Sequence, residues 1–181
     1  MAVVNRPSDP YDDALTAYHA GRYDEAAATL QTLLGAGEAR GHEPATAGKV
    51  LALMARIEAN QGKLDQAADW AQRAIAADKV NPGFYYLLGT ILEEQHRPAD
   101  AAQALQRALY LDSTFVLAHY TLGTLTLREH GRKAAHRHFL NAASLLARLP
   151  KDEGLPESEG LTAGRLLAII ETMTGREAPT P

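Results

Sequence analysis

Histidines and adjacent carboxylates are the side chains of this sequence that could perform acid–base or metal chemistry. The chain contains seven histidines. His136 and His138 are two positions apart, which separates them by about 200° around a helix, so they cannot bind one ion from one face. Glu93 and Glu94 are adjacent and diverge by about 100°, which does not suit a pair of cooperating acid–base groups. The spacing therefore predicts no catalytic residue, no metal site and no cofactor.

Composition and charge argue against several classes of protein. There are 22 acidic and 18 basic residues, giving a formal net charge of −4, whereas a nucleic-acid-binding domain normally has a basic excess. Cysteine is absent, so disulfides and cysteine-based metal sites are excluded. No apolar run reaches the roughly 18 residues of a membrane-spanning helix, and "MAVVNRPSDP" has too short an apolar run for a signal peptide. We therefore expect a soluble cytoplasmic protein that neither binds nucleic acid nor inserts into a membrane.

The sequence repeats itself at an interval of about 34 residues. The segment "YYLLGTILEEQHRPADAAQALQRAL", which begins at Tyr85, aligns with "HYTLGTLTLREHGRKAAHRHFLNAA", which begins at His119, so that Gly89 corresponds to Gly123. The same interval leads back to "VLALMARIEANQGKLDQAADWAQRAIAAD". A fainter copy, "ALTAYHAGRYDEAAATLQTLL", lies nearer the N-terminus, and the extra residues of the Gly-rich segment 35–44 are expected to form a loop.

A two-helix unit of about 34 residues has the length of a tetratricopeptide repeat, and the segment 11–149 resembles that family. The resemblance implies an all-α fold, an α-solenoid of about four helix pairs. Gly89 and Gly123 fall within predicted helices, where glycine costs roughly 1 kcal/mol relative to alanine. We therefore expect the paired helix to approach closely at both glycines. The predicted helices span residues 10–20, 24–34, 45–60, 64–77, 82–95, 98–111, 115–129, 132–148 and 162–174.

Residues that tolerate a left-handed backbone mark the turn within each pair. Gly21, Gly62, His96 and His130 occupy equivalent places where the first helix of a pair should end. Pro98 then falls in the first turn of the next helix, where its missing N–H is harmless. The two histidines are therefore interpreted as turn residues and not as catalysts.

The last predicted helix does not match the repeat. Thr162 is its predicted N-cap, and an apolar stripe at helical spacing follows, formed by Leu166, Ile169, Ile170 and Met173. Because a stack of repeats needs a terminal cap, we expect this helix to cover the open end of the fourth pair. The expected organisation is a disordered segment 1–9, four helical hairpins in 10–149, a linker 150–161, a capping helix 162–174 and a disordered tail 175–181.

The segment "HRHFLNAASLLARLPKDEGLPESEGLTAGRLLAIIETM", residues 136–173, resembles the carboxy-terminal end of bacterial CheR-type chemotaxis receptor methyltransferases that carry a tetratricopeptide extension, and Leu161–Leu166, "LTAGRL", stand in its short-helix motif. In that family an acidic linker rich in Pro, Ser and Gly joins the last repeat to a short helix. The resemblance implies a regulatory or targeting module that binds a chemoreceptor, the methyltransferase domain or another signalling protein. The catalytic domain, which uses S-adenosylmethionine, would precede the repeats, so we expect no enzymatic activity from this chain. The alternative is a generic tetratricopeptide scaffold or adaptor in an unrelated bacterial complex.

The first helices of the pairs are expected to line a concave surface that binds a protein or peptide. Tyr86 and Tyr120 occupy the same position in successive repeats, and tyrosine suits recognition because it combines a large contact area with a polar tip. Packing between adjacent helices is the alternative role for both rings. The cationic set by which chaperone-binding tetratricopeptide domains hold a terminal carboxylate is mostly missing. The candidate groove residues are Arg56, Asn60, Tyr86, Thr90, Glu93, Tyr120, Thr124 and Arg128.

The most basic segment of the sequence contains Arg128, Arg132, Lys133 and Arg137. A solvated helix face is the ordinary explanation for such a cluster. The alternative is a surface that attracts an acidic partner, acting on the rate of association more than on affinity.

Overall fold

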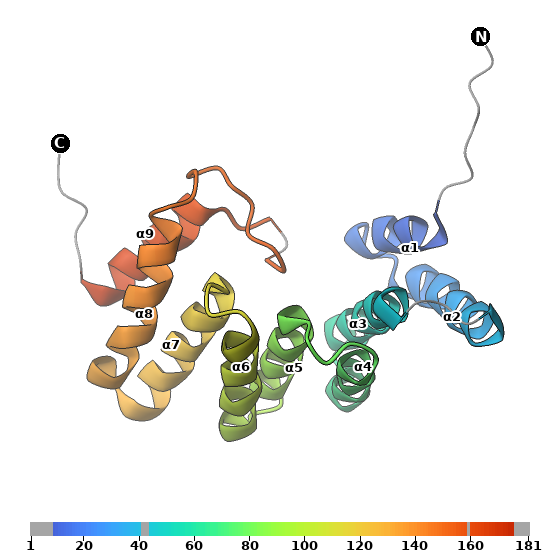
Figure 1. Cartoon of the computed structure of the whole chain (residues 1–181), viewed down its shortest axis with the longest axis horizontal. Coiled ribbons are helices and arrows are strands. Elements are labelled where there is room, and N and C mark those ends of the chain that lie inside the picture. The colour runs from blue at the N-terminus through green and yellow to red at the C-terminus, as the bar shows by residue number, and fades with distance from the viewer. Residues whose placement is uncertain (1–8, 41–43, 159, 176–181) are drawn as a thin grey trace, which may run out of the picture. The chain divides into compact units, whose positions relative to one another are not determined.

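The fold consists of helices arranged in consecutive pairs (Figure 1). The computed structural model describes residues 9–40, 44–158 and 160–175, and no strand occurs among them apart from an isolated bridge between Gly154 and Thr162. The all-α fold predicted from the sequence is confirmed. In this described part the helices are α1 (Pro10–His19), α2 (Tyr23–Arg40), α3 (Pro44–Asn60), α4 (Leu64–Ala77), α5 (Pro82–Glu94), α6 (Pro98–Leu111), α7 (Val116–His130), α8 (Arg132–Leu146) and α9 (Ala163–Thr174).

The chain forms two compact units, Met1–Val80 and Asn81–Pro181. In the first unit α1 packs against α2 and α3 against α4, and α2 contacts α3. In the second unit α5 packs against α6 and α7 against α8, while α6 contacts α7 and α8 contacts α9. Each unit therefore contains two helix pairs, and α9 follows the last pair as an additional helix.

Residues 35–40 of one predicted loop are helical, and its residues 41–43 lie outside the described part of the chain. The second helix is predicted to end at residue 34 and residues 35–44 to form a loop, whereas α2 continues to Arg40 and α3 begins at Pro44. Alanine, glutamate and arginine alternate with the glycines of this segment, and these strong helix formers offset the helix-breaking tendency of glycine.

The turns within the pairs follow the prediction at three places out of four. The backbone is left-handed at Gly21 (φ 72°), Gly62 (φ 75°) and His96 (φ 58°). The prediction for His130 is wrong, because His130 is the last residue of α7 and Gly131 (φ 81°) makes the turn instead. Glycine adopts a positive φ at little cost because it has no Cβ, so the turn forms one residue later.

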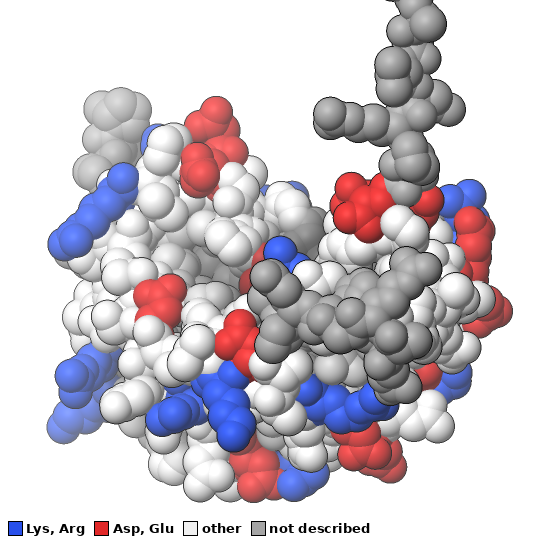
Figure 2. Space-filling model, turned by 45° about the vertical axis from the view of Figure 1, so that its right-hand side comes forward, with Lys and Arg blue, Asp and Glu red and all other residues white. Residues whose placement is uncertain are grey.

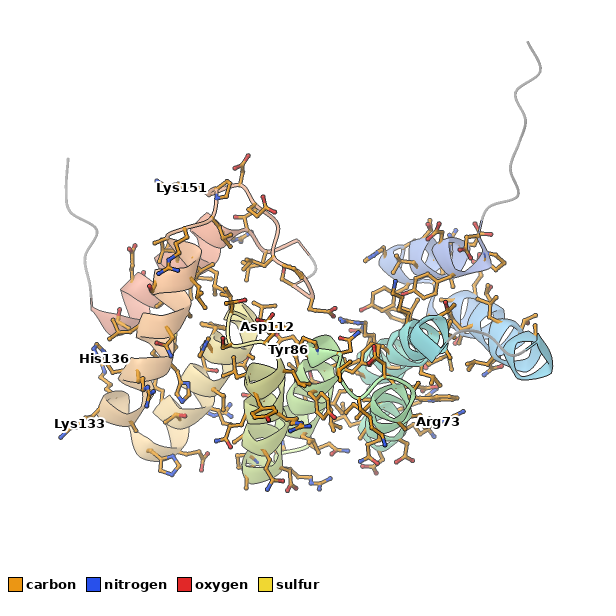
Figure 3. All side chains as sticks on the ribbon, viewed as in Figure 1. Arg73, Tyr86, Asp112, Lys133, His136 and Lys151 are labelled. Atoms are coloured by element: carbon orange, nitrogen blue, oxygen red, sulfur yellow. The ribbon has the colours of Figure 1, made fainter. Side chains whose placement is uncertain are left out.

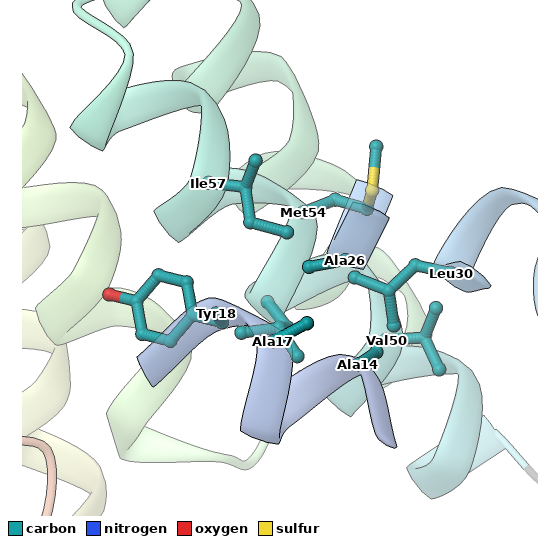
Figure 4. Packing of buried hydrophobic residues seen from close by; sticks show 9 residues of the cluster. Ala14, Ala17, Tyr18, Ala26, Leu30, Val50, Met54 and Ile57 are labelled. Carbon is teal, nitrogen blue, oxygen red and sulfur yellow. The ribbon is translucent and has the colours of Figure 1, made fainter. Parts of the chain in front are cut away.

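Small buried residues bring the helices of the first unit together. Figure 4 shows Ala14 of α1 and Ala26 of α2 next to Leu30, Met54 and Ile57. All five side chains are at most 1% exposed. Alanine at these positions lets the apolar side chains of three helices interlock, which explains the high alanine content of a core poor in aromatic residues.

Glycine allows a still closer contact in the second unit. A Cβ atom on Gly89 of α5 would lie 2.8 Å from Cγ of Leu105 in α6, and one on Gly123 of α7 would lie 2.7 Å from Cε1 of Phe139 in α8. Leu105 and Phe139 are buried, with exposures of 0% and 3%. The close approach predicted from the two mid-helix glycines is confirmed, and any larger residue would displace a packed side chain.

The capping helix α9 lies against α8, as predicted. Leu166 and Ile170 are 0% and 1% exposed and belong to one apolar cluster with side chains of α8. The hydroxyl of Thr162 accepts a hydrogen bond from the backbone N–H of Arg165 at 3.4 Å, which confirms the predicted N-cap. Ile169, which the sequence analysis places in the buried stripe, is 38% exposed because it is turned about 100° away from Ile170 around the helix.

Backbone hydrogen bonds fasten the linker to the start of α9. The N–H of Gly164 donates to the carbonyl oxygen of Lys151, and the N–H of Ala163 donates to that of Glu153, both at 2.9 Å. A Cβ atom on Gly164 would lie 2.9 Å from the same Lys151 oxygen. Glycine is therefore required here because the linker passes directly over the helix N-terminus.

The predicted disordered ends lie almost wholly outside the described residues, which begin at Asp9 and end at Gly175. Asp9 is the N-cap of α1, accepting a hydrogen bond from the N–H of Tyr11 at 3.0 Å, and Gly175 is the left-handed C-cap of α9. In the described part of the chain, no helix combines the length and apolar character needed to cross a membrane.

Replacing Gly123 with leucine should lower the free energy of unfolding by about 1–3 kcal/mol, because the new side chain overpacks the contact with Phe139. The matched control is Gly35→Leu in α2, where no atom lies within 4 Å of the added Cβ and better helix propensity should raise stability slightly. Urea denaturation of both variants measures the difference. Equal stability of the two variants would show that the α7–α8 contact is not tight.

Replacing Leu166 with alanine should lower the free energy of unfolding by about 2–5 kcal/mol, because a fully buried side chain leaves a cavity beneath α9. The half-exposed Ile169 provides the control, since Ile169→Ala should cost about 0.5 kcal/mol. Denaturation curves of the two variants provide the comparison. If both variants lost the same stability, α9 would not have the orientation described.

Candidate functional site

A groove of about 760 Å³ lies on the second unit between α5 and α7, the first helices of its two pairs. Five of the eight predicted groove residues line it, namely Thr90, Glu93, Tyr120, Thr124 and Arg128. The structure adds Glu94, His96, Thr121 and Glu129 among the lining residues. These additional residues are next to the predicted ones in sequence or lie at the helix ends, where the sequence pattern does not separate groove from solvent.

An ion pair connects the two helices across the groove. The guanidinium Nη2 of Arg128 lies 2.9 Å from Oε1 of Glu93. Their side chains are 59% and 22% exposed, so the pair contributes little to stability. It does hold the two side chains in place at the edge of the groove, where a partner would meet an ordered charged surface.

Tyr120 is the aromatic side chain of the groove. It is half-buried, and its ring centroid lies 6.3 Å from that of Phe139 in α8. Burial raises the pKa of Tyr120, and the carboxylate of Glu93 raises it further because it repels the tyrosinate anion. Tyr120 therefore keeps its O–H as a hydrogen-bond donor toward the groove throughout the neutral pH range.

Two of the three threonines of the groove, Thr90 and Thr124, donate their hydroxyl protons to backbone carbonyl oxygens. The hydroxyl of Thr90 donates to the carbonyl oxygen of Leu87 at 2.8 Å, and that of Thr124 donates to Thr121 at 2.9 Å. Each oxygen can still accept a hydrogen bond from a partner. The groove thus offers acceptors from its carboxylates and threonines, and donors from Tyr120 and Arg128.

The other three predicted residues lie outside this groove. Tyr86 packs its ring 5.2 Å from that of Phe115, which is the packing alternative considered for it. Arg56 and Asn60 belong to the first unit. There the side-chain amide of Asn60 donates to the buried hydroxyl of Tyr18 at 2.9 Å.

Two of the described histidines lie close to each other on different helices. Spacing along a single helix cannot reveal such a contact. The rings of His119 in α7 and His138 in α8 have centroids 6.2 Å apart. Burial lowers the pKa of His138, and the neighbouring His119 and Arg137 lower it further, so the ring favours its neutral form. Among the residues that the structure describes, no group of three or more histidines, cysteines, aspartates or glutamates could hold a metal ion.

Charges of both signs occur on the face of the molecule shown in Figure 2. On the face shown in Figure 2, basic and acidic side chains are interspersed and neither sign covers a continuous area. The part of this face that the structure describes therefore lacks the basic stripe by which nucleic-acid-binding proteins are recognised.

Replacing Glu93 with glutamine should lower the pKa of Tyr120 toward the ordinary tyrosine value of 10.0, because one of the two causes that raise it is removed. Burial remains and should keep the pKa above that value. A titration of ring-labelled tyrosine by NMR measures the shift. In Glu94→Gln, the neighbouring control, the pKa of Tyr120 should stay unchanged, and the same fall in both variants would contradict the geometry of the groove.

Solved structures with the same fold include other helical repeat proteins. MamA, residues 41 to the end, from Desulfovibrio magneticus RS-1 has 21% sequence identity and a TM-score of 0.63, covering 76% of this chain and 75% of that chain. YrrB, a TPR protein with an unusual peptide-binding site, has 17% identity and a TM-score of 0.59 over 93% of this chain and 77% of that one. The first TPR of Spaghetti (RPAP3), bound to the HSP90 peptide SRMEEVD, has 18% identity and a TM-score of 0.56 over 72% and 95%.

Comparison with known sequences gives information beyond the similarity in fold. No curated protein matches the chain. The tetratricopeptide repeat profile matches residues 11–82 and 52–114, which together are more than half of the chain. The repeat period, the paired helices and the small residues at their contacts agree with this match. The chain therefore belongs to the tetratricopeptide repeat family.

Proposed function

We propose that this chain is a protein-interaction module that binds an extended segment of a partner protein in the groove between α5 and α7. The observation that carries the proposal is the groove itself, in which Tyr120 and the Glu93–Arg128 pair offer an aromatic face and ordered charges. Two proteins of similar fold support it, since one is described with a peptide-binding site and another is bound to an HSP90 peptide. Helical repeats of this kind are typical of interaction modules that perform no catalysis.

The charge of the groove defines the chemistry of the partner. Three carboxylates line it, those of Glu93, Glu94 and Glu129, against the single guanidinium of Arg128. Because Arg128 is already paired with Glu93, an acidic segment would meet like charge and no free cation within the groove. We therefore propose a partner segment that carries lysine or arginine, in contrast to the acidic peptide SRMEEVD bound by the similar RPAP3 domain.

A generic scaffold or adaptor agrees with the comparisons better than the narrower CheR-type assignment. The narrower proposal, a module that targets a chemoreceptor methyltransferase, rests on the resemblance of residues 136–173, whose short-helix motif is the segment Leu161–Leu166. Within that segment Thr162 caps α9, Gly164 admits the linker and Leu166 is buried. Because the capping helix itself requires these residues, their resemblance to the CheR-type family says little about which partner the chain binds. A cytoplasmic location stays part of the proposal.

Reversing two exposed charges of the groove tests the proposal. The full chain is screened against an array of peptides of about 10 residues that vary in net charge, and the best binders are measured by fluorescence anisotropy. Peptides with lysine or arginine should bind best and should weaken as salt is added. Glu94→Lys/Glu129→Lys should reduce their affinity about tenfold, because both carboxylates become repulsive.

The matched control is Asp69→Lys/Asp152→Lys, which changes the net charge by the same amount at exposed positions outside the groove. Its affinity for the same peptides should stay within about twofold of the original chain. An equal loss of peptide affinity in both double variants would show that the overall charge of the protein, and not the groove, determines the effect. A preference for acidic or neutral peptides would contradict the proposed partner chemistry.

A further inference from the structure

A second groove, of about 800 Å³, runs between α8 and α9. Phe139 and Leu140 line it from α8, and Leu167 and Ile170 line it from α9. Phe139 and Ile170 form its buried floor, while Leu140 is 41% exposed at its edge. The groove is therefore apolar at its base and leaves a large aliphatic side chain uncovered.

The groove exists because α9 has no helix paired with it in the described part of the chain. In the second unit α7 contacts α6 of the preceding pair and also packs along its own partner α8. The contact of α9 with α8 resembles the contact of α7 with α6. No described helix packs along α9 in the way that α8 packs along α7. Its residues Leu167, Ile170, Glu171 and Thr174 face the groove at helical spacing. The groove between α8 and α9 therefore lies where a helix paired with α9 would pack.

A basic cluster lies on α8 beside this groove, in which His136 belongs to the lining and Arg132, Lys133 and Arg137 do not. Lys133 and His136 project from the same side of α8 (Figure 3), and Arg132 and Arg137 lie within one turn of His136. All four side chains are exposed. No acidic residue occurs anywhere in α8. Within the described residues none of Arg132, Lys133 and Arg137 takes part in an ion pair.

The other second helices have the opposite charge at their N-termini. The first turn of α2, α4 and α6 contains an acidic residue in each case, Asp24 and Glu25, Asp65, and Asp100. In α6 Asp100 also pairs with Arg97 at 2.7 Å. In α8 two cations occupy the first turn, where the helix dipole adds positive potential. The first turn of α8, beside the groove, therefore attracts negative charge, while the acidic side chain in the lining of the groove is Glu171 of α9.

We propose that the groove between α8 and α9 binds an amphipathic helix of a partner protein whose polar face carries acidic residues near the first turn of α8. The apolar face of that helix packs on Leu140, Leu167 and Ile170, as in other complexes in which a helix fills a hydrophobic groove. Its carboxylates meet Lys133 and Arg137. A second copy of this chain fits less well, because a symmetric contact would bring the basic clusters of both copies into one interface.

Selection from a display library tests this proposal on the full chain. The library contains peptides of about 20 residues with a fixed leucine stripe at helical spacing and a randomised polar face. Selected peptides should be enriched in glutamate and aspartate and should become helical on binding. Leu140→Glu and, independently, Lys133→Glu should each weaken the selected peptides about tenfold, through lost apolar contact and through repulsion.

Lys49→Glu is the matched control for Lys133→Glu, because it makes the same exchange at an exposed helix position in the first unit and should leave affinity within about twofold. Glu94→Lys/Glu129→Lys should also leave these peptides bound, which separates this site from the groove between α5 and α7. Failure to select any peptide, selection of peptides without acidic enrichment, or insensitivity to both groove variants would overturn the proposal. So would self-association of the chain that Leu140→Glu abolishes, since the occupant would then be a second copy.

Discussion

Close contact between the two helices of a pair is the constraint on which the rest of this structure depends. The contact requires a small residue on the first helix, and Ala55, Gly89 and Gly123 occupy that same position in successive repeats. At Gly123 the ring of Phe139 fills the space that a side chain would take. Because the face of α7 that carries Gly123 is turned toward α8, the rotation of α7 about its own axis is determined. Tyr120, Thr124 and Arg128 then lie on a different face and line the groove shared with α5.

The same packing rule leaves two grooves of different chemistry on the second unit. The groove between α5 and α7 is polar, carries three carboxylates and holds its one arginine in an ion pair. The groove between α8 and α9 has an apolar floor and Glu171 in its lining, and a basic cluster lies beside it on α8. If both proposals hold, the second unit recognises two segments of different chemistry in two separate grooves.

The structure also explains the segment Leu161–Leu166, which resembles a family with a catalytic domain. Thr162 caps the helix, Ala163 is 1% exposed, Gly164 is required by the carbonyl of Lys151, and Leu166 is buried. Arg165 alone is exposed among these residues. A linker that folds back over a helix N-terminus demands such residues in any protein that ends its repeats in this way. Similarity of this segment is therefore strong evidence for a shared cap and weak evidence for a shared partner.

The sequence by itself determined the repeat, the all-α fold, the helix order and the two glycine contacts, because the repeat period and the placing of small residues are properties of the chain alone. It also indicated one face of each first helix, so that five groove residues could be named. It could not separate Tyr120, which lines the groove, from Tyr86, which packs on Phe115, since both occupy the same position in the repeat. It placed Ile169 in the buried stripe and the turn at His130, because one residue of rotation or length depends on packing against a neighbour. Only the tertiary structure decided which charges meet. Arg128 pairs with Glu93 on another helix, while Lys133 and Arg137 have no acidic partner among the described residues. The reason is that no pattern along a single helix determines the distance between side chains of different helices.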